Sequence, residues 1–182
     1  NNFSQEGSYG IYLIGSMASM VALTDGTIYE ISASNRLALQ EFFLTSIAPT
    51  IFEGNLMAPF RGRTIARQIA ADYDLGLSAM ATAMGLALND TSEIAATIKS
   101  DVKHWLTSFT PFDLEEKSTS PTRYQRLHDL RNDEEISGTT VYGFFPRYTG
   151  GRAIWRREDF AFVLSLSSRR IGLYETTQVG ST

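Results

Sequence analysis

The densest group of residues that could bind a charged ligand is the stretch RGRTIAR, which begins at Arg61. It places three arginines, Arg61, Arg63 and Arg67, within seven residues. Arg63 and Arg67 are four residues apart, so they would share one face of a helix. The planar guanidinium group binds carboxylate and sulfate groups through two parallel hydrogen bonds. Taken alone, the stretch is better explained as a solvated basic loop, or as arginines paired with Glu53 and Asp72.

The second candidate is Tyr9, which stands in the glycine-flanked motif GSYG at the start of an expected helix. The simpler interpretation is a turn that carries an aromatic packing residue. A tyrosine that faced several arginines would have its phenolate form stabilised. Such a tyrosine could exchange protons with a substrate near neutral pH.

Other kinds of chemistry find little support. His104 and His128 stand far apart, and no group of His, Asp and Glu has the spacing of metal ligands, so we predict no metal and no cofactor. The absence of cysteine excludes a disulfide scaffold and a cysteine nucleophile. No histidine accompanies a Gly-x-Ser-x-Gly turn, which disfavours a serine hydrolase.

Trp155 lies among arginine pairs in the last third of the chain. With Arg156-Arg157 and Arg169-Arg170 it could line a sugar-binding surface. Exposed charges on strands are the simpler explanation, and we prefer it.

The composition is that of a soluble globular chain. The 182 residues carry a formal net charge of −4, and 43% of them are hydrophobic. This mild acidity argues against a nucleic-acid partner. The longest apolar stretch, residues 11–23, is too short to span a bilayer, so we expect no membrane partner. The length suits one domain or a domain with part of another.

Apolar spacing predicts helices in the first part of the chain and strands in the last. The helices are expected around residues 13–21, 37–47, 72–88 and 92–106, and the strands at 139–145, 152–156, 160–167 and 170–176. Residues 110–137 are polar and contain two prolines, which predicts a long connector with at most one short helix. Helices followed by antiparallel strands indicate an α+β domain or two domains.

Two motifs in this order resemble polysaccharide lyase family 8, which includes hyaluronate, chondroitin AC and xanthan lyases. Ser8-Tyr9-Gly10 matches the family pattern S-Y-G, and residues 62–67 match G-R-x-[IV]-[SA]-R. The later run AIWRREDFAF at 153–162, with SSRRI at 167–171 and Tyr174-Glu175, is similar to the start of the family's β-sandwich. The resemblance therefore covers nearly the whole chain.

This resemblance implies an α+β fold: part of an (α/α) toroid followed by the first strands of an antiparallel β-sandwich. Residues 1–137 would be the C-terminal part of the toroid with its connector, and residues 138–182 the start of the β-sheet domain. The implied activity is that of a secreted bacterial enzyme that cleaves an acidic polysaccharide (hyaluronan, chondroitin or xanthan type) by β-elimination without a metal. By match, Tyr9 and Arg63 would be catalytic, and Arg67 and Arg61 would bind the substrate.

The sequence also departs from the family pattern. The family uses a histidine that ends an F-x-Q-H pattern nine residues before the tyrosine, which here falls immediately before Asn1, and an asparagine further upstream. The family's N-x-E-N stretch is replaced by the residues around Gln178. We therefore expect one segment of a longer lyase, inactive alone, whose partners are the upstream helical half and downstream β-domains of the same enzyme.

Two alternatives remain open at this point. One is a non-catalytic carbohydrate-binding protein on the same fold. The other is an unrelated helical domain with a β extension, which would be preferred if Tyr9 lay far from Arg63.

Overall fold

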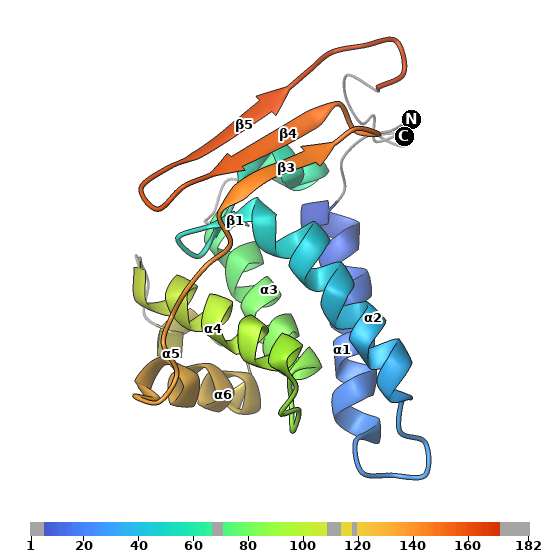
Figure 1. Cartoon of the computed structure of the whole chain (residues 1–182), viewed down its shortest axis with the longest axis vertical. Helices are drawn as coiled ribbons and strands as arrows, with labels where there is room; N and C mark the ends of the chain where they lie inside the picture. The colour runs from blue at the N-terminus through green and yellow to red at the C-terminus, as the bar shows by residue number, and fades with distance from the viewer. Residues whose placement is uncertain (1–5, 67–70, 109–113, 118–119, 172–182) are drawn as a thin grey trace, which may run out of the picture.

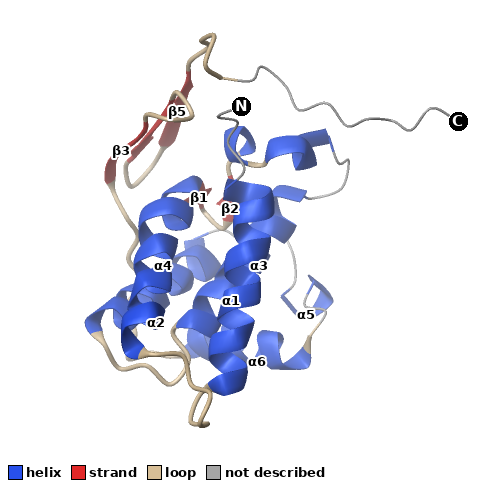
Figure 2. Ribbon diagram, turned by 90° about the vertical axis from the view of Figure 1, so that its right-hand side faces the viewer, coloured by secondary structure: helices blue, strands red, loops and turns tan. Residues whose placement is uncertain are grey.

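The computed structural model describes residues 6–66, 71–108, 114–117 and 120–171. Helices occupy the first part of this chain, and an antiparallel sheet of three strands lies across one end of them (Figures 1 and 2). The predicted order of helices and then antiparallel strands is confirmed. The α-helices are α1 (Ile11–Thr24), α2 (Ala33–Phe42), α3 (Ala71–Leu86), α4 (Glu93–Ser108), α5 (Leu114–Lys117) and α6 (Pro121–Asn132). The strands are β1 (Ile51–Phe52), β2 (Asn55–Leu56), β3 (Gly143–Arg147), β4 (Arg152–Arg156) and β5 (Ala161–Ser165).

Short irregular turns connect these elements. Two are single π-helical turns, η1 (Glu6–Gly10) and η2 (Phe43–Ile47), and three are 3₁₀ turns, η3 (Ala48–Thr50), η4 (Ala58–Phe60) and η5 (Gly62–Ala66). Isolated π turns are rare and occur often at functional sites.

Helix α1 packs along α3, with a buried stripe of Ile11, Ile14, Ala18 and Val21. The two backbones approach closely, because a Cβ on Gly85 would lie only 3.2 Å from the Cβ of Ala18. Helix α1 contains the predicted residues 13–21. Of the four residues that predict it, Val21 is buried, whereas Leu13, Met17 and Met20 are exposed on its other side. A helix that is apolar on both sides has helically spaced apolar residues on each of them, so this spacing predicts the helix but not which side is buried.

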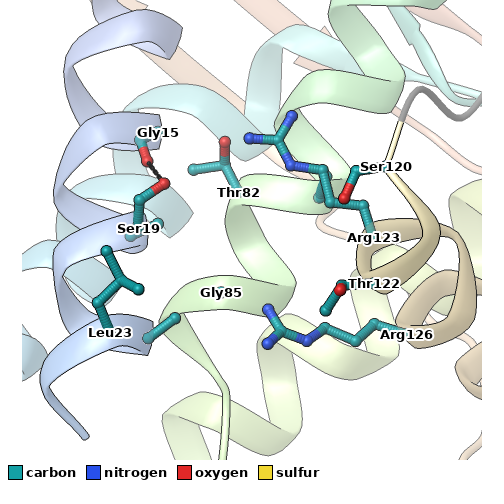
Figure 3. A pocket seen from close by; sticks show the side chains of 12 residues that line it. Gly15, Ser19, Leu23, Thr82, Gly85, Ser120, Thr122, Arg123 and Arg126 are labelled. Atoms are coloured by element: carbon teal, nitrogen blue, oxygen red, sulfur yellow. Dashed lines mark hydrogen bonds between the residues drawn. The ribbon is translucent and has the colours of Figure 1, made fainter.

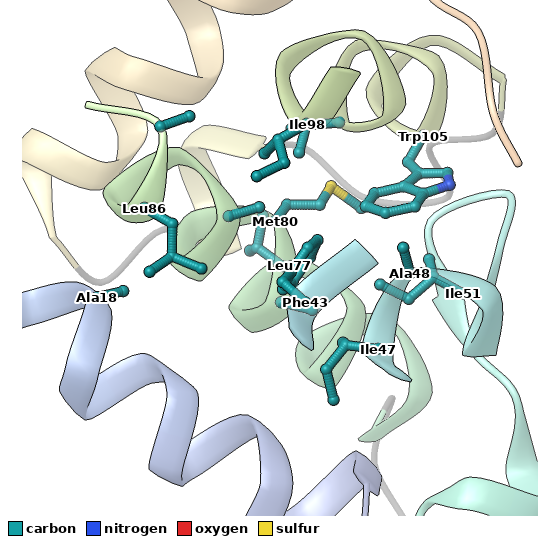
Figure 4. Packing of buried hydrophobic residues seen from close by; sticks show 14 of the residues in the cluster. Ala18, Phe43, Ile47, Ala48, Ile51, Leu77, Met80, Leu86, Ile98 and Trp105 are labelled. Atoms are coloured by element: carbon teal, nitrogen blue, oxygen red, sulfur yellow. The ribbon is translucent and has the colours of Figure 1, made fainter. Parts of the chain in front are cut away.

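The core lies where α3, α4 and η2 meet (Figure 4). Met80 of α3 lies beside the ring of Trp105 from α4, and Phe43 of η2 packs near them with its ring centroid 6.5 Å from that of Trp105. Ile98, about two turns before Trp105 on α4, is also fully buried. The predicted start of α4 is confirmed, since the Ser92 hydroxyl accepts a hydrogen bond from the Ala95 amide at 3.4 Å.

Residues 110–137 contain two helices, α5 and α6, where at most one short helix is predicted. The larger of them is residues 121–132. This segment forms α6, which packs against α3 and α4 and buries Leu127 and Leu130. Pro121 occupies the first turn of the helix, where a missing N–H costs nothing. Proline also interrupts helices, and in a polar segment with few apolar residues the sequence does not show which of the two roles Pro121 has.

The three-stranded sheet has one face against the helices and one face outward. Strand β4 pairs antiparallel with both β3 and β5, and its predicted bounds are confirmed. Strand β3 begins at Gly143 rather than 139, and β5 ends at Ser165 rather than 167. Of the last predicted strand, residues 170 and 171 are not in a strand, and the remainder lies outside the described residues.

Alternation along the strands sends three arginines inward. Arg147 of β3 donates to the carbonyls of Thr45 and Ser46 at 2.7 and 3.2 Å. The guanidinium carbon of Arg152 lies 5.9 Å from the ring centre of Phe60. Together with Arg156, these side chains attach the sheet to residues 45–60, the stretch that leads to the predicted arginine site. On the outward face, Phe144, Trp155 and Phe162 form an exposed row across the strands, as described by the strand register.

Candidate functional site

Tyr9 is carried by the π turn η1, immediately before α1. Gly7 and Ser8 are buried, while 50% of Tyr9 is exposed, so the turn is anchored on one side and presents its tyrosine on the other. Glycine is required at position 7, because a Cβ there would lie 2.5 Å from the backbone carbonyl oxygen of Phe60 in η4. The motif GSYG is thus a turn, as the simpler interpretation has it, and one held directly against η4.

The arginine stretch follows η4 as a second tight turn. Gly62 has a φ of +55°, a left-handed conformation that favours glycine. Thr64 is buried and its hydroxyl donates to the carbonyl of Arg61 at 2.5 Å, which closes the turn. Residues 62–66 then form η5, so the expected arrangement of Arg63 and Arg67 on one α-helical face does not occur within η5. The side chain of Arg63 and the whole of Arg67 lie outside the described residues.

These two turns meet in the fold. Residues of η1 contact those of η5 and of η4, although Tyr9 and Arg63 are separated by 54 positions in the chain. The condition that would have favoured an unrelated helical domain, a Tyr9 turn remote from the arginine turn, is not met. The backbone turn that carries Tyr9 therefore lies next to the backbone turn that carries Arg63.

Arg61 borders a hollow of about 410 Å³ between the helices and the sheet. Its walls include Glu53 and Asn55 of the β1–β2 hairpin, Tyr73 of α3 and Val163 of β5. Arg61 and Glu53 form no ion pair, so the alternative that pairs this arginine with Glu53 is wrong. The Arg61 Nε atom is buried and has no hydrogen-bond partner within the described part of the chain. Arg61 lines the hollow, and a guanidinium group binds oxyanions through parallel N–H donors.

Comparisons with known proteins identify the family of this chain. Residues 1–104 match the N-terminal alpha-helical domain of polysaccharide lyase family 8. The chain belongs to this family. It is 27% identical over 96% of its length to a xanthan lyase of Bacillus sp. (strain GL1) and 28% identical over 96% to a hyaluronate lyase of Thermasporomyces composti. It spans 19% and 23% of the lengths of these two relatives.

Solved structures show the same relationship in three dimensions. The chain superposes on a Paenibacillus xanthan lyase with a TM-score of 0.81 and 26% identity, covering 96% of this chain and 17% of that one. A Streptomyces coelicolor chondroitin AC lyase in complex with chondroitin sulphate gives a TM-score of 0.85 at 22% identity, a likeness of fold alone, over 95% of this chain and 25% of that one. The predicted fold class, part of an (α/α) toroid followed by antiparallel strands, is confirmed.

The family 8 chain also contains a buried polar cluster that sequence reasoning missed. Arg156 was expected to be an exposed strand charge, yet only 1% of it is exposed. Its Nη1 donates to the carbonyls of Pro49, at 3.3 Å, and Ile51, and its guanidinium carbon lies 5.3 Å from the ring centre of Phe52. Asp101 of α4 is 2% exposed and is the negative charge that Arg156 interacts with.

Both members of this cluster carried a weak signal in the sequence. Ile154 predicts an inward face of β4, and Arg156 is two residues further on the same face. Asp101 lies three residues after Ile98 and four before Trp105, within the apolar stripe of α4. A charged residue on an apolar stripe can still turn outward at the edge of the core, so the pattern alone does not decide burial.

The buried carboxyl gives the fold a pH dependence. Burial raises the pKa of Asp101 to about 7, and the positive charge of Arg156 offsets only part of this shift. An unfolded aspartate ionises at about pH 4, so between about pH 4 and pH 7 the folded chain holds one more proton than the unfolded chain. The free energy of unfolding therefore falls as the pH rises through this window.

We expect Asp101→Asn to remove this slope, measured as the free energy of urea unfolding at several pH values within the window. Burial lowers the pKa of His104, with Arg156 as a further cause. This group makes the free energy of unfolding rise with pH below about pH 6.5, which is opposite to the effect of Asp101. That contribution is common to both proteins and cancels in their difference. Parallel curves for the wild type and the variant would contradict the prediction.

No group of three or more His, Asp or Glu side chains in the described part of the chain is arranged to hold a metal ion. None of its helices combines the length and apolarity that crossing a bilayer requires. His104 and His128 both lie in helices away from η1, on α4 and α6.

Proposed function

We propose that this chain is a catalytic-domain segment of a secreted bacterial polysaccharide lyase that cleaves a uronate-containing acidic polysaccharide by β-elimination. The observation that carries the proposal is the contact between the Tyr9 turn and the arginine turn η5, together with the half-exposed state of Tyr9. Membership of a lyase family and relatives named xanthan lyase and hyaluronate lyase support the reaction class. Secretion follows from the size of such polymers, which reach an enzyme only outside the cell.

In the proposed reaction, the Tyr9 phenolate takes the proton on C5 of the uronate ring. The electron pair left on C5 forms a C4–C5 double bond as the C4–oxygen bond to the neighbouring sugar breaks. Tyr9 returns its proton to that leaving oxygen, so one side chain is base and then acid. The products are an unsaturated uronate end and a free hydroxyl, without any added water.

The arginines supply the charge that this reaction needs. A C5 proton is only weakly acidic, and negative charge grows on the carboxylate side as the proton leaves. Arg63, adjacent to Tyr9 through η1 and η5, is proposed to stabilise the phenolate and the developing charge. Arg67 and Arg61 are proposed to bind the substrate, Arg61 through its hollow beside the hairpin.

The rest of the same enzyme is the proposed partner of this chain. Helix α1 exposes a second apolar stripe in which Leu13 is 60% and Leu23 77% accessible. Helices that are apolar on both sides are characteristic of the interior of larger proteins. This chain spans about a fifth of the length of two relatives, and the remainder of such a protein would supply the elements that cover the exposed stripe of α1.

A non-catalytic carbohydrate-binding protein on this fold is the second candidate. The exposed cross-strand row of Phe144, Trp155 and Phe162 favours it, because a flat aromatic surface can bind the apolar faces of sugar rings. This candidate predicts saccharide binding without new double bonds.

The elimination assay separates the two candidates. The full-length protein should generate the ultraviolet absorbance of the conjugated unsaturated uronate from hyaluronan, chondroitin or xanthan, and this chain alone should not. Binding of all three polymers without absorbance would favour the second candidate. Turnover by this chain alone at the rate of the full-length protein would overturn its proposed status as a segment.

A further inference from the structure

A hollow of about 340 Å³ lies between α1, α3 and the first turn of α6, apart from the Tyr9 turn and from the hollow of Arg61 (Figure 3). Its floor is formed where α1 and α3 approach through small residues, among them Gly15, Ala18 and Gly85. Ser19, on the wall formed by α1, is roughly 12 Å along the helix from Ile11 at 1.5 Å per residue. The volume is in the range of sites that hold one small ligand.

The polar groups of this hollow have one electrical sign. Arg123 and Arg126 of α6 both direct their guanidinium groups into it, Arg123 toward Thr82 and Arg126 toward Gly85 (Figure 3). No acidic side chain of the described residues lines it. Arg126 also borders a neighbouring hollow that contains Asp129 and Asp133, but within the described chain neither arginine forms an ion pair or a hydrogen bond.

Two further donors point to the same ligand chemistry. Thr82 is 7% exposed and lines the hollow, and its hydroxyl has no hydrogen-bond partner among the described residues. The hydroxyl is therefore available to a ligand that enters the hollow. Helix α6 starts here, and the Ser120 side chain does not cap it. Pro121 has no N–H and the Tyr124 amide donates to the Ser120 carbonyl, so the amides of Thr122 and Arg123 are the ones available to an anion.

We infer that this hollow binds an oxyanion, the carboxylate or sulfate group of an acidic saccharide, at a site separate from the catalytic turn. Two guanidinium groups, three residues apart on α6, offer several planar N–H donors to a carboxylate or sulfate group. The Thr82 hydroxyl adds a neutral donor from α3. The small residues of the floor leave room for a sugar ring beside the anionic group. The saccharide part of this inference rests on the proposed function, whereas the oxyanion part does not.

Calorimetric titration of the full-length protein tests the inference with two probes, sodium sulfate and sodium glucuronate, at constant ionic strength. The wild type is expected to bind both. The double variant Arg123→Gln with Arg126→Gln should bind at least about tenfold more weakly, the change given by loss of one charge-assisted hydrogen bond. Thr82→Val should weaken binding about fivefold, the effect of one neutral hydrogen bond.

Arg131→Gln is the matched control, because Arg131 is on the same helix and does not line the hollow. It should bind both probes as the wild type does. Sulfate binding without glucuronate binding would leave an oxyanion site and remove the saccharide from the inference. Equal affinities in the wild type and the double variant, or no saturable binding of either probe, would overturn the site itself. Neither outcome depends on whether Tyr9 catalyses elimination.

Discussion

Tyr9→Phe in the full-length protein is expected to lower kcat for elimination by about 10²- to 10⁴-fold, the usual contribution of a positioned general base. Phenylalanine keeps the ring that η1 presents and removes only the oxygen that takes and returns the proton. Because the turn is anchored through Gly7 and Ser8, the substitution should leave the contact between η1 and η5 unchanged. Substrate affinity should stay within about twofold, so that the loss is one of kcat.

Tyr12→Phe is the control for this prediction. Tyr12 lies one turn further along α1 and is 53% exposed, so it offers the same chemistry at the same accessibility. Its replacement should change kcat by less than about twofold, as for an exposed site away from the chemistry. A Tyr9→Phe enzyme with wild-type kcat would exclude this tyrosine as the base, and loss of binding in step with kcat would indicate a structural role.

Arg156→Met is expected to lower the free energy of unfolding by about 3–5 kcal/mol, the cost of removing one partner from a buried charged group. The methionine fills part of the volume but donates nothing to the carbonyls of Pro49 and Ile51. It also removes the positive charge that partly offsets the effect of burial on the pKa of Asp101, so this carboxyl is held more firmly in its neutral form. Urea unfolding followed by the fluorescence of the two tryptophans, Trp105 in the core and Trp155 on β4, measures the loss.

Arg157→Met provides the comparison, since Arg157 is the next residue, carries the same side chain and is exposed. Its effect should lie within about 0.5 kcal/mol of zero. If both variants were equally stable, the attachment of the sheet through Arg156 would contribute nothing, and the inward arginines would be incidental to the fold.

Local pattern explains which parts of the fold could be predicted. The spans of α1, α3 and α4 follow from apolar residues at helical spacing and from the turn and cap residues that end or begin them. Strand β4 follows from a short β-prone run between glycines and a charged turn. The connector prediction allowed one short helix and did not place α6, because its sequence is polar and only Leu127 and Leu130 are buried. Its stability comes from packing on α3 and α4.

The order and spacing of S-Y-G and RGRTIAR determined the family by themselves, because these motifs are contiguous and keep their residues whatever surrounds them. Contact between the turns that carry them was decided only by the tertiary structure, since α1, α2 and the β1–β2 hairpin must first fold the chain back on itself. The burial of Arg156 and Asp101 was likewise a tertiary result. Whether a charge is solvated or buried depends on the elements that pack over it, and no local spacing specifies those elements.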